Sequence, residues 1–179
     1  RNCLVGSEMC IRDRYINDGN ANFSRLPVAL PSTNGSVVVS HDIDNDGYDD
    51  LFVGSRSIPG GYGLSPYSFI IKNTRDGNFE PIVQSRLGMI TDAKWGNIDN
   101  DPEFELIVVG DWTPVIVIDQ NQDGKFVASK LKGGENYYGL WNTVELADLN
   151  VDGMSDILVG NTGKNFKWQP TMESPVYLY

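Results

Sequence analysis

Short apolar runs separated by polar turns recur along most of the chain, and they predict strands rather than helices. The runs cover residues 37–39, 51–53, 69–71, 106–109, 115–118 and 157–159. They are rich in branched and aromatic side chains, as is typical of buried strands. No segment shows the 3.6-residue period of an amphipathic helix. We therefore expect an all-β protein.

Two motifs alternate along the chain with a regular spacing, which indicates an internal repeat. The first is an acidic loop whose three copies begin at Asp42, Asn97 and Asp148, 55 and 51 residues apart. The second is a turn containing Asp-Gly, within 17–23, 73–79 and 121–126, and this dipeptide between apolar runs marks a β-hairpin. Each unit then supplies four strands in about 50 residues, the size of a propeller blade.

This repeat divides the chain into blades. Residues 15–179 are expected to form a partial β-propeller: 15–30 ends one blade, 36–83 and 88–131 are whole blades, and 141–179 starts another, with its third strand near 176–179. The expected fold is a fragment of a β-propeller with four-stranded antiparallel blades, open rather than closed. The remaining blades of a full-length chain would be its first partners.

Residues 1–14 lack both the alternation and the repeat. The run from Leu4 to Asp13 resembles a translated adapter from sequencing-library preparation, so we expect 1–14 to be non-native and to make few contacts. Both cysteines, Cys3 and Cys10, lie in this segment. The rest of the chain therefore needs no disulfide and offers no thiol nucleophile.

Each acidic loop carries oxygen-bearing side chains at positions one, three, five and nine, with a backbone carbonyl available at position seven. The candidate ligands are Asp42, Asp44, Asp46, Asp50 and the carbonyl of Tyr48; Asn97, Asp99, Asp101, Glu105 and the carbonyl of Glu103; and Asp148, Asn150, Asp152, Asp156 and the carbonyl of Met154. Ca²⁺ takes six to eight oxygens at about 2.3–2.6 Å. Carboxylates gathered without a cation would repel one another and raise their pKa values. A single copy could be a solvated acidic turn, but three copies in phase predict Ca²⁺ sites.

An EF-hand begins with the same acidic spacing, but it requires a glutamate at position twelve and flanking helices. Position twelve is Val53, Val108 and Val159, inside predicted strands, which excludes an EF-hand. The first loop matches the calcium pattern fully, and the third has one charge fewer because of Asn150. In the second loop Pro102 replaces the turn glycine and restricts the backbone. We therefore expect calcium affinity to fall from the first loop to the third to the second.

With these loops the chain resembles the VCBS/FG-GAP repeats, the Ca²⁺-loop blades of integrin α-subunit heads, and especially bacterial secreted proteins that often end in an ASPIC/UnbV-type module. The segments 59–66, 139–142 and 160–163, with Asn165, add to the likeness. It covers residues 15–179. The resemblance implies an extracellular or cell-surface propeller of about seven blades, with a signal peptide outside this segment.

The net charge is −10, with 24 acidic against 14 basic residues, which argues against nucleic acid or an anionic membrane surface as a partner. The chain has no apolar run long enough for membrane insertion. Catalytic signatures are also absent from the sequence. His41 is the only histidine, and beside the first acidic loop it fits a structural role better than that of a general base.

The aromatic residues allow two interpretations. Trp95, Trp112, Trp141, Trp168, Tyr137 and Tyr138 could stack on sugar rings, although such residues more often fill the wedges between blades. The polar segment 161–168 is the first candidate for a ligand contact. The favoured function is a noncatalytic, calcium-stabilised scaffold for adhesion or for recognition of a glycan or surface protein. The alternative is part of a Ca²⁺-dependent propeller enzyme, such as a polysaccharide lyase, with its catalytic residues elsewhere.

Overall fold

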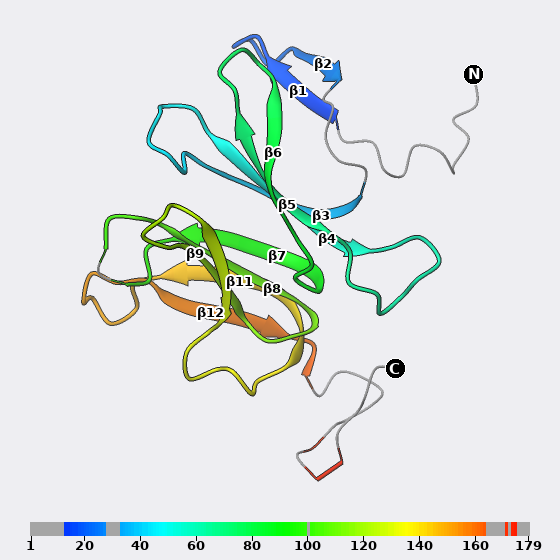
Figure 1. The fold of residues 1–179 in the computed structure, drawn as a ribbon, viewed down its shortest axis with the longest axis vertical. Helices are drawn as coiled ribbons and strands as arrows, with labels where there is room; N and C mark the ends of the chain where they lie inside the picture. The colour runs from blue at the N-terminus through cyan, green and yellow to red at the C-terminus, as the bar shows by residue number, and fades with distance from the viewer. Residues whose placement is uncertain (1–12, 28–32, 100, 164–170, 172, 175–179) are drawn as a thin grey trace.

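The structure is a computed structural model that describes residues 13–27, 33–99, 101–163, 171, 173 and 174. Within these residues the chain forms twelve β-strands in three antiparallel sheets (Figure 1). The strands are β1 (Asp13–Asn17), β2 (Phe23–Pro27), β3 (Asn34–His41), β4 (Asp50–Ser57), β5 (Ser68–Asn73), β6 (Phe79–Ser85), β7 (Met89–Gly96), β8 (Glu105–Thr113), β9 (Ile116–Gln120), β10 (Phe126–Lys130), β11 (Gly139–Ala147) and β12 (Asp156–Asn161).

The three sheets follow one another along the chain. Strands β1 and β2 form a hairpin, and β3 to β6 form a four-stranded sheet in sequence order. Strands β7 to β10 also pair in sequence order, each with the next. No described sheet closes on itself, so the expected all-β fold of open, four-stranded antiparallel units is confirmed. The described residues also contain no helix that is long and apolar enough to cross a membrane.

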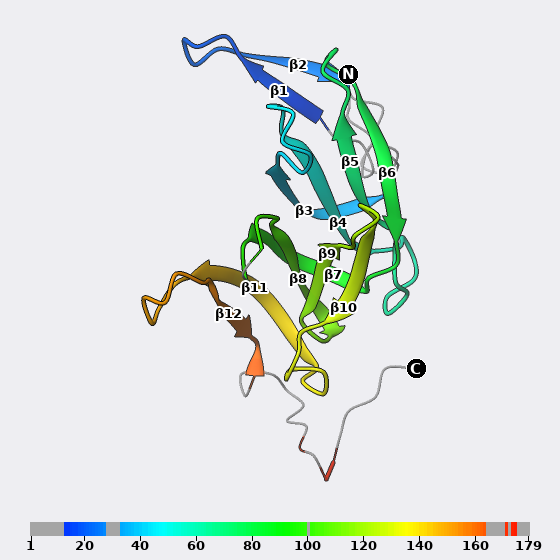
Figure 2. The same ribbon diagram turned by 60° about the vertical axis from the view of Figure 1, so that its left-hand side comes forward.

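The last two strands are joined to the preceding unit, which the repeat did not predict. Strand β11 pairs with β12, but its first residues, Gly139 and Leu140, also pair with Thr113 and Asp111 at the end of β8. A six-stranded sheet results, with β7 beside β8 as an additional branch. The hydrogen-bonded pairing is short, because only Gly139 and Leu140 pair with β8, but β11 continues beside β8 and packs against it (Figure 2).

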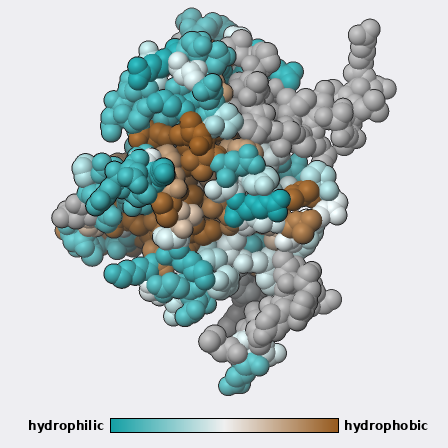
Figure 3. All heavy atoms as spheres, viewed as in Figure 1, coloured by the Kyte–Doolittle hydropathy of each residue, from teal (hydrophilic) through white to brown (hydrophobic). Residues whose placement is uncertain are grey.

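Alternate residues of the central strands supply two separate apolar layers. On β8, Leu106 and Val108 belong to a core that also holds Phe52 and Ile70 of the β3–β6 sheet. Ile107 and Val109, on the opposite face of β8, pack with Val144 of β11. Both faces of β8 are buried, which explains why its sequence is a continuous apolar run. Figure 3 shows hydrophobic surface between the β3–β6 sheet and the β7–β12 sheet.

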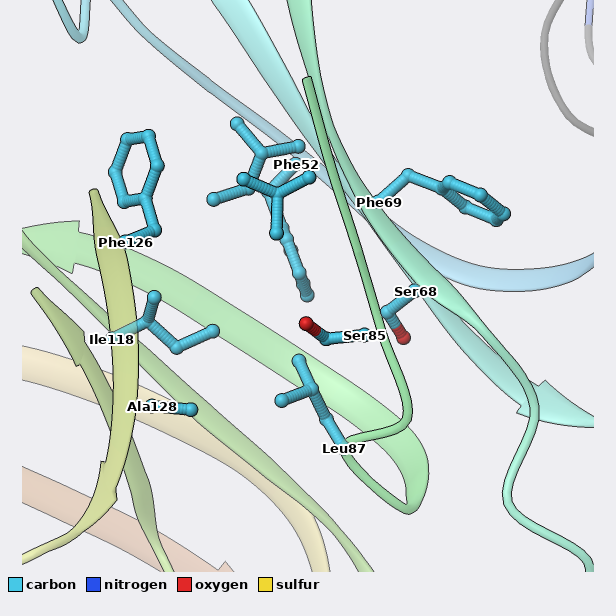
Figure 4. A pocket seen from close by; sticks show the side chains of 10 residues that line it. Phe52, Ser68, Phe69, Ser85, Leu87, Ile118, Phe126 and Ala128 are labelled. Atoms are coloured by element: carbon cyan, nitrogen blue, oxygen red, sulfur yellow. The ribbon is translucent and has the colours of Figure 1, made fainter. Parts of the chain in front are cut away.

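A shallow hollow opens where the β3–β6 and β7–β10 sheets face each other (Figure 4). Phe52 and Phe69 border it on one side, and Ile118, Phe126 and Ala128 border it on the other. The hydroxyl-bearing side chains of Ser68 and Ser85 also line it. Phe52 and Ile118 also belong to the apolar core between the two sheets, so the hollow is continuous with the packing between units.

The N-terminal boundary differs from the expectation. Residues 1–12, including both cysteines, lie outside the described residues. Asp13 and Arg14, however, belong to β1 and pair with Pro27 and Leu26 of β2. Arg14 also donates a hydrogen bond to the carbonyl of Gly77 (2.9 Å), and its guanidinium lies over a ring of the β3–β6 sheet. The expected limit at residue 14 therefore lies within a strand.

Candidate metal centre

The three acidic loops occupy the same edge of the molecule because each one joins the first and second strands of a unit. Residues 42–49 link β3 to β4, residues 97–104 link β7 to β8, and residues 148–155 link β11 to β12. All three lie at the left in Figure 1. Asn100, at position four of the second loop, is outside the described residues.

A common pattern of hydrogen bonds shapes the three loops. The acid at position nine accepts the N–H of position two, and the acid at position five accepts the N–H of position seven. The first set is Ile43–Asp50 (3.4 Å), Ile98–Glu105 (2.8 Å) and Leu149–Asp156 (2.9 Å). The second set is Tyr48–Asp46 (2.9 Å), Glu103–Asp101 (3.0 Å) and Met154–Asp152 (2.8 Å). These bonds hold the acidic side chains toward the inside of each loop.

The first and third loops also share a carboxylate at position one that caps the backbone. Asp42 accepts the N–H groups of Asp46 (2.9 Å) and Gly47 (2.7 Å). Asp148 accepts the corresponding groups of Asp152 (3.1 Å) and Gly153 (2.9 Å). Both glycines have positive φ angles, 86° and 93°, which a glycine adopts without steric cost.

The second loop achieves its turn in another way. Pro102 occupies the position of these glycines and has no N–H to donate. Position one is Asn97, whose side-chain amide donates to the carbonyl of Asp101 (2.6 Å) instead of accepting from the loop. An aspartate at position one would have lost one hydrogen-bond donor here, because Pro102 has no N–H. The asparagine stabilises the loop through its own amide instead.

Two of the three loops bring their acids together. The carboxylates of Asp42, Asp44 and Asp50, and those of Asp99, Asp101 and Glu105, each offer oxygen atoms within 4.8 Å of one another. These are the groups found in the described part of the chain, and each could hold a metal ion. The second loop gathers its acids despite Pro102. The roles of the carbonyls of Tyr48, Glu103 and Met154 stay predictions.

The third loop does not form such a group within the described residues. Its side chain at position three, Asn150, donates to a carboxylate oxygen of Asp152 (2.8 Å). The N–H of Met154 and, to a smaller extent, the Asn150 amide lower the pKa of Asp152. Its ligand set of Asp148, Asn150, Asp152 and Asp156 remains a prediction.

Basic side chains from the β5–β6 hairpin reach into the first loop. The Lys72 ammonium contacts a carboxylate oxygen of Asp44, and that hydrogen bond raises the pKa of Lys72. The Arg75 guanidinium binds Asp46 with two contacts, of 2.8 Å and 2.7 Å. Burial opposes the ionisation of Asp46, but Arg75 and the N–H of Tyr48 outweigh it and lower the pKa. The loop sequence gives no sign of these cations, which lie about 28 residues away along the chain.

The acids at position nine are the deepest residues of the two acidic groups. Asp50 and Glu105 are each 1% exposed. Burial raises the pKa of Asp50, while N–H groups of Asn73 and Ile43 oppose that shift. Burial also raises the pKa of Glu105. Its bond from Ile98 opposes the shift, and repulsion from the neighbouring carboxylates adds to it.

Unsatisfied oxygens distinguish the second loop from the other two. Glu105 Oε2 accepts the N–H of Ile98, but Glu105 Oε1 is buried with no hydrogen-bond partner in the described residues. Asn97 Oδ1 is likewise buried and unpaired there. A buried acceptor without a partner is costly, and a bound cation is one way to satisfy it. The candidate metal-ligand atoms are all oxygens, which suits a hard divalent cation.

The remaining candidate residues have mainly structural contacts. His41 stacks on Trp95 and Phe104, as expected for a structural histidine. Trp141 donates to the carbonyl of Thr113 (2.9 Å) at the junction of β8 and β11. Tyr137 and Tyr138 are exposed. Trp168, Asn165 and most of the segment 161–168 lie outside the described residues.

No family model matches the chain, and neither a curated protein nor a solved structure matches it. The resemblance to VCBS/FG-GAP repeats therefore stays a prediction from the sequence. The class that the fold itself defines is an open, all-β protein with blade-like antiparallel sheets and acidic clusters that could bind a metal.

Proposed function

We propose that this chain is part of a calcium-binding β-propeller of the VCBS/FG-GAP type, which acts as a noncatalytic scaffold for recognition outside the cell. The observation that carries the calcium proposal is the buried Oε1 of Glu105, which lies beside Asp99 and Asp101 and has no hydrogen-bond partner among the described residues. Three carboxylates at one point repel one another unless a cation is present. An ion with oxygen ligands and flexible geometry fits this donor set.

The chemistry of such a site, together with the resemblance, supports the proposed extracellular location. Extracellular calcium modules bind at about 10⁻⁴–10⁻³ M, so their occupancy requires calcium concentrations found outside the cell. The metal binds the folded loop rather than the unfolded chain and so stabilises the fold. Calcium would then fix the shape of an edge that carries three loops.

Recognition is proposed for exposed aromatic side chains away from the acidic loops. Tyr62 is 70% exposed in the β4–β5 connection, which lies across the molecule from the acidic loops in Figure 1. Its hydroxyl accepts a hydrogen bond from Trp112 Nε1 (3.4 Å), and Trp112 has a positive φ of 62°, which is strained for a tryptophan. Tyr137 and Tyr138, in the β10–β11 connection, are 69% and 55% exposed. Rings of this kind stack on sugars or on apolar protein surfaces.

The calcium proposal is tested by calorimetric titration of the chain with CaCl₂, with MgCl₂ as a control. Melting with CaCl₂ against EGTA gives a second measure. We expect calcium to bind and to raise the melting temperature, and Glu105→Gln to reduce both effects. Magnesium should bind more weakly because it demands a stricter octahedral geometry. No calcium binding at millimolar concentration would refute the proposal.

The recognition proposal needs a separate experiment. Binding of the chain to a panel of immobilised polysaccharides is measured with the polysaccharides recovered and sized afterwards. A scaffold would bind without shortening them, and Tyr62→Ala would weaken the binding. Shortened or unsaturated products would instead support the enzymatic alternative.

A further inference from the structure

The first two acidic loops face different side chains at one equivalent position on the third strand of their units. Leu51 of β4 pairs with Ile71 of β5, and Leu106 of β8 pairs with Ile118 of β9. Leu51 and Leu106 each directly follow the acid at position nine of their loop. The residue after each partner is therefore equivalent in the two units: it is Lys72 in the first and Asp119 in the second.

In the first unit, the chain supplies its own cations to the loop. Lys72 contacts Asp44, and Arg75 binds Asp46 with contacts of 2.8 Å and 2.7 Å. Asp50 is also satisfied by the backbone: one oxygen accepts the N–H of Asn73 (2.7 Å), and the other accepts a loop N–H. The charges and the buried oxygens of this loop thus have partners within the protein.

In the second unit, the equivalent position adds a negative charge. Asp119 Oδ1 is buried without a hydrogen-bond partner in the described residues, as are Glu105 Oε1 and Asn97 Oδ1. Glu105 is 1% exposed, and its carboxylate lies within 4.8 Å of those of Asp99 and Asp101. Because Leu106 pairs with Ile118, Asp119 lies at the position opposite Glu105 on the neighbouring strand, and its charge adds to the repulsion on Glu105. A positive charge would satisfy these buried oxygens and offset the repulsion among the acids, and among the described residues no ion pair supplies one as Lys72 does in the first unit.

We infer that Asp119 is a further acidic residue of the second-loop metal site. The first unit has Lys72 at the equivalent position, and this difference decides which loop depends on calcium. The first loop is held by an internal ammonium group, and the second loop is held by the metal. This inference rests on the proposed calcium binding. It reverses the order of affinity expected from the loop sequences, in which Pro102 made the second loop the weakest.

The test is calorimetric titration of the full 179-residue chain with CaCl₂, comparing Asp119→Asn with Asp123→Asn. Asp123 is exposed in the β9–β10 turn, so its substitution removes the same charge close by without touching the buried oxygens. Asp119→Asn should weaken the tightest site by about 10–100-fold, the range found when residues that support metal ligands are changed. Asp123→Asn should leave the affinity within about twofold. Equal effects of the two substitutions would overturn the inference.

A second variant, Lys72→Met, tests the first loop independently and decides the matter if Asp119→Asn fails to fold. Removing the ammonium group frees Asp44 for calcium. The calcium affinity of the first loop should therefore rise by about tenfold or more, seen as an additional or a tighter site. No gain in binding by Lys72→Met would count against the internal cation. If the unmodified chain binds no calcium at all, the proposed function fails and the inference fails with it. If it binds calcium with equal affinity in all variants, only the inference fails.

Discussion

The imidazole ring of His41 lies almost parallel to the ring of Phe104, with the centroids 4.6 Å apart and the planes at 8°. His41 ends β3, next to the first acidic loop, whereas Phe104 lies in the second acidic loop. The other neighbour of His41 is Trp95 of β7, with centroids 5.4 Å apart. This stacking connects the end of β3, beside the first loop, with the second loop, which belongs to a different sheet. A change in one loop is therefore expected to affect the other.

We expect His41→Ala and Phe104→Ala to destabilise the protein non-additively. Aromatic pairs contribute about 0.5–1.5 kcal/mol beyond the burial of their area, so the double variant should lose less than the sum of the single variants by about that amount. The measurement is the free energy of unfolding in urea for a double-mutant cycle. Strict additivity would show that the rings touch without mutual stabilisation.

The pairing of Asn97 with Pro102 predicts that these two positions depend on each other. In the calcium-free protein, Asn97→Asp removes the donor to the Asp101 carbonyl and adds a charge to an acidic loop, so it should cost about 1–3 kcal/mol. Adding Pro102→Gly supplies a backbone N–H at the position equivalent to Gly47, whose N–H Asp42 accepts in the first loop. The double variant should therefore recover part of the loss. Urea unfolding in EGTA measures both changes. A double variant less stable than Asn97→Asp alone would contradict the explanation.

The β5–β6 hairpin carries a carboxylate that should make stability pH-dependent. The Thr74 hydroxyl, the N–H of Asn78 and the Asn78 amide lower the pKa of Asp76 from 3.8 to about 2. A depressed pKa contributes stability above the unfolded value, and this is lost as the pH falls from 3.8 through about 2. Asp76→Asn should therefore lower the melting temperature at about pH 6, with a difference that shrinks toward pH 2.

The matched control for this change is Asp123→Asn, since Asp123 precedes the glycine of the β9–β10 hairpin just as Asp76 precedes Gly77. Thermal melting of both variants is followed across the acid range. A difference between wild type and Asp76→Asn that stays constant with pH would rule out the carboxylate as its source.

The glycine that ends each apolar run has a packing role that can be tested at Gly110. A Cβ atom on Gly110 would lie 2.3 Å from the backbone oxygen of Met89, on the paired strand β7. Because backbone cannot move aside cheaply, Gly110→Ala should destabilise by about 1–3 kcal/mol or more. Gly134→Ala is the control, since its nearest neighbour would be 3.4 Å away. Equal unfolding free energies for the two variants would contradict this reading.

Strand positions and the acidic loops could be predicted from the sequence because both depend on local patterns. Alternation along β8 decides which face each side chain takes, and a continuous apolar run indicates that both faces are buried. The hydrogen bonds within each loop join residues two to seven positions apart, such as Ile98 and Glu105, so their spacing is visible in the sequence. The order of strands within a unit follows from the hairpin turns between them.

The tertiary structure decided what surrounds those loops, because the deciding contacts join residues far apart in the chain. Lys72 meets Asp44 across 28 residues, and the backbone of β11 pairs with β8 only at the strand ends. Arg14 reaches Gly77 across 63 residues, which places β1 against the first full sheet. Pairing between strands sets these neighbours, and that register depends on the packing of whole sheets. The sequence by itself therefore determined that acids gather in loops. Only the fold decided which loop receives an internal cation and which one has buried oxygens without a partner in the described part of the chain.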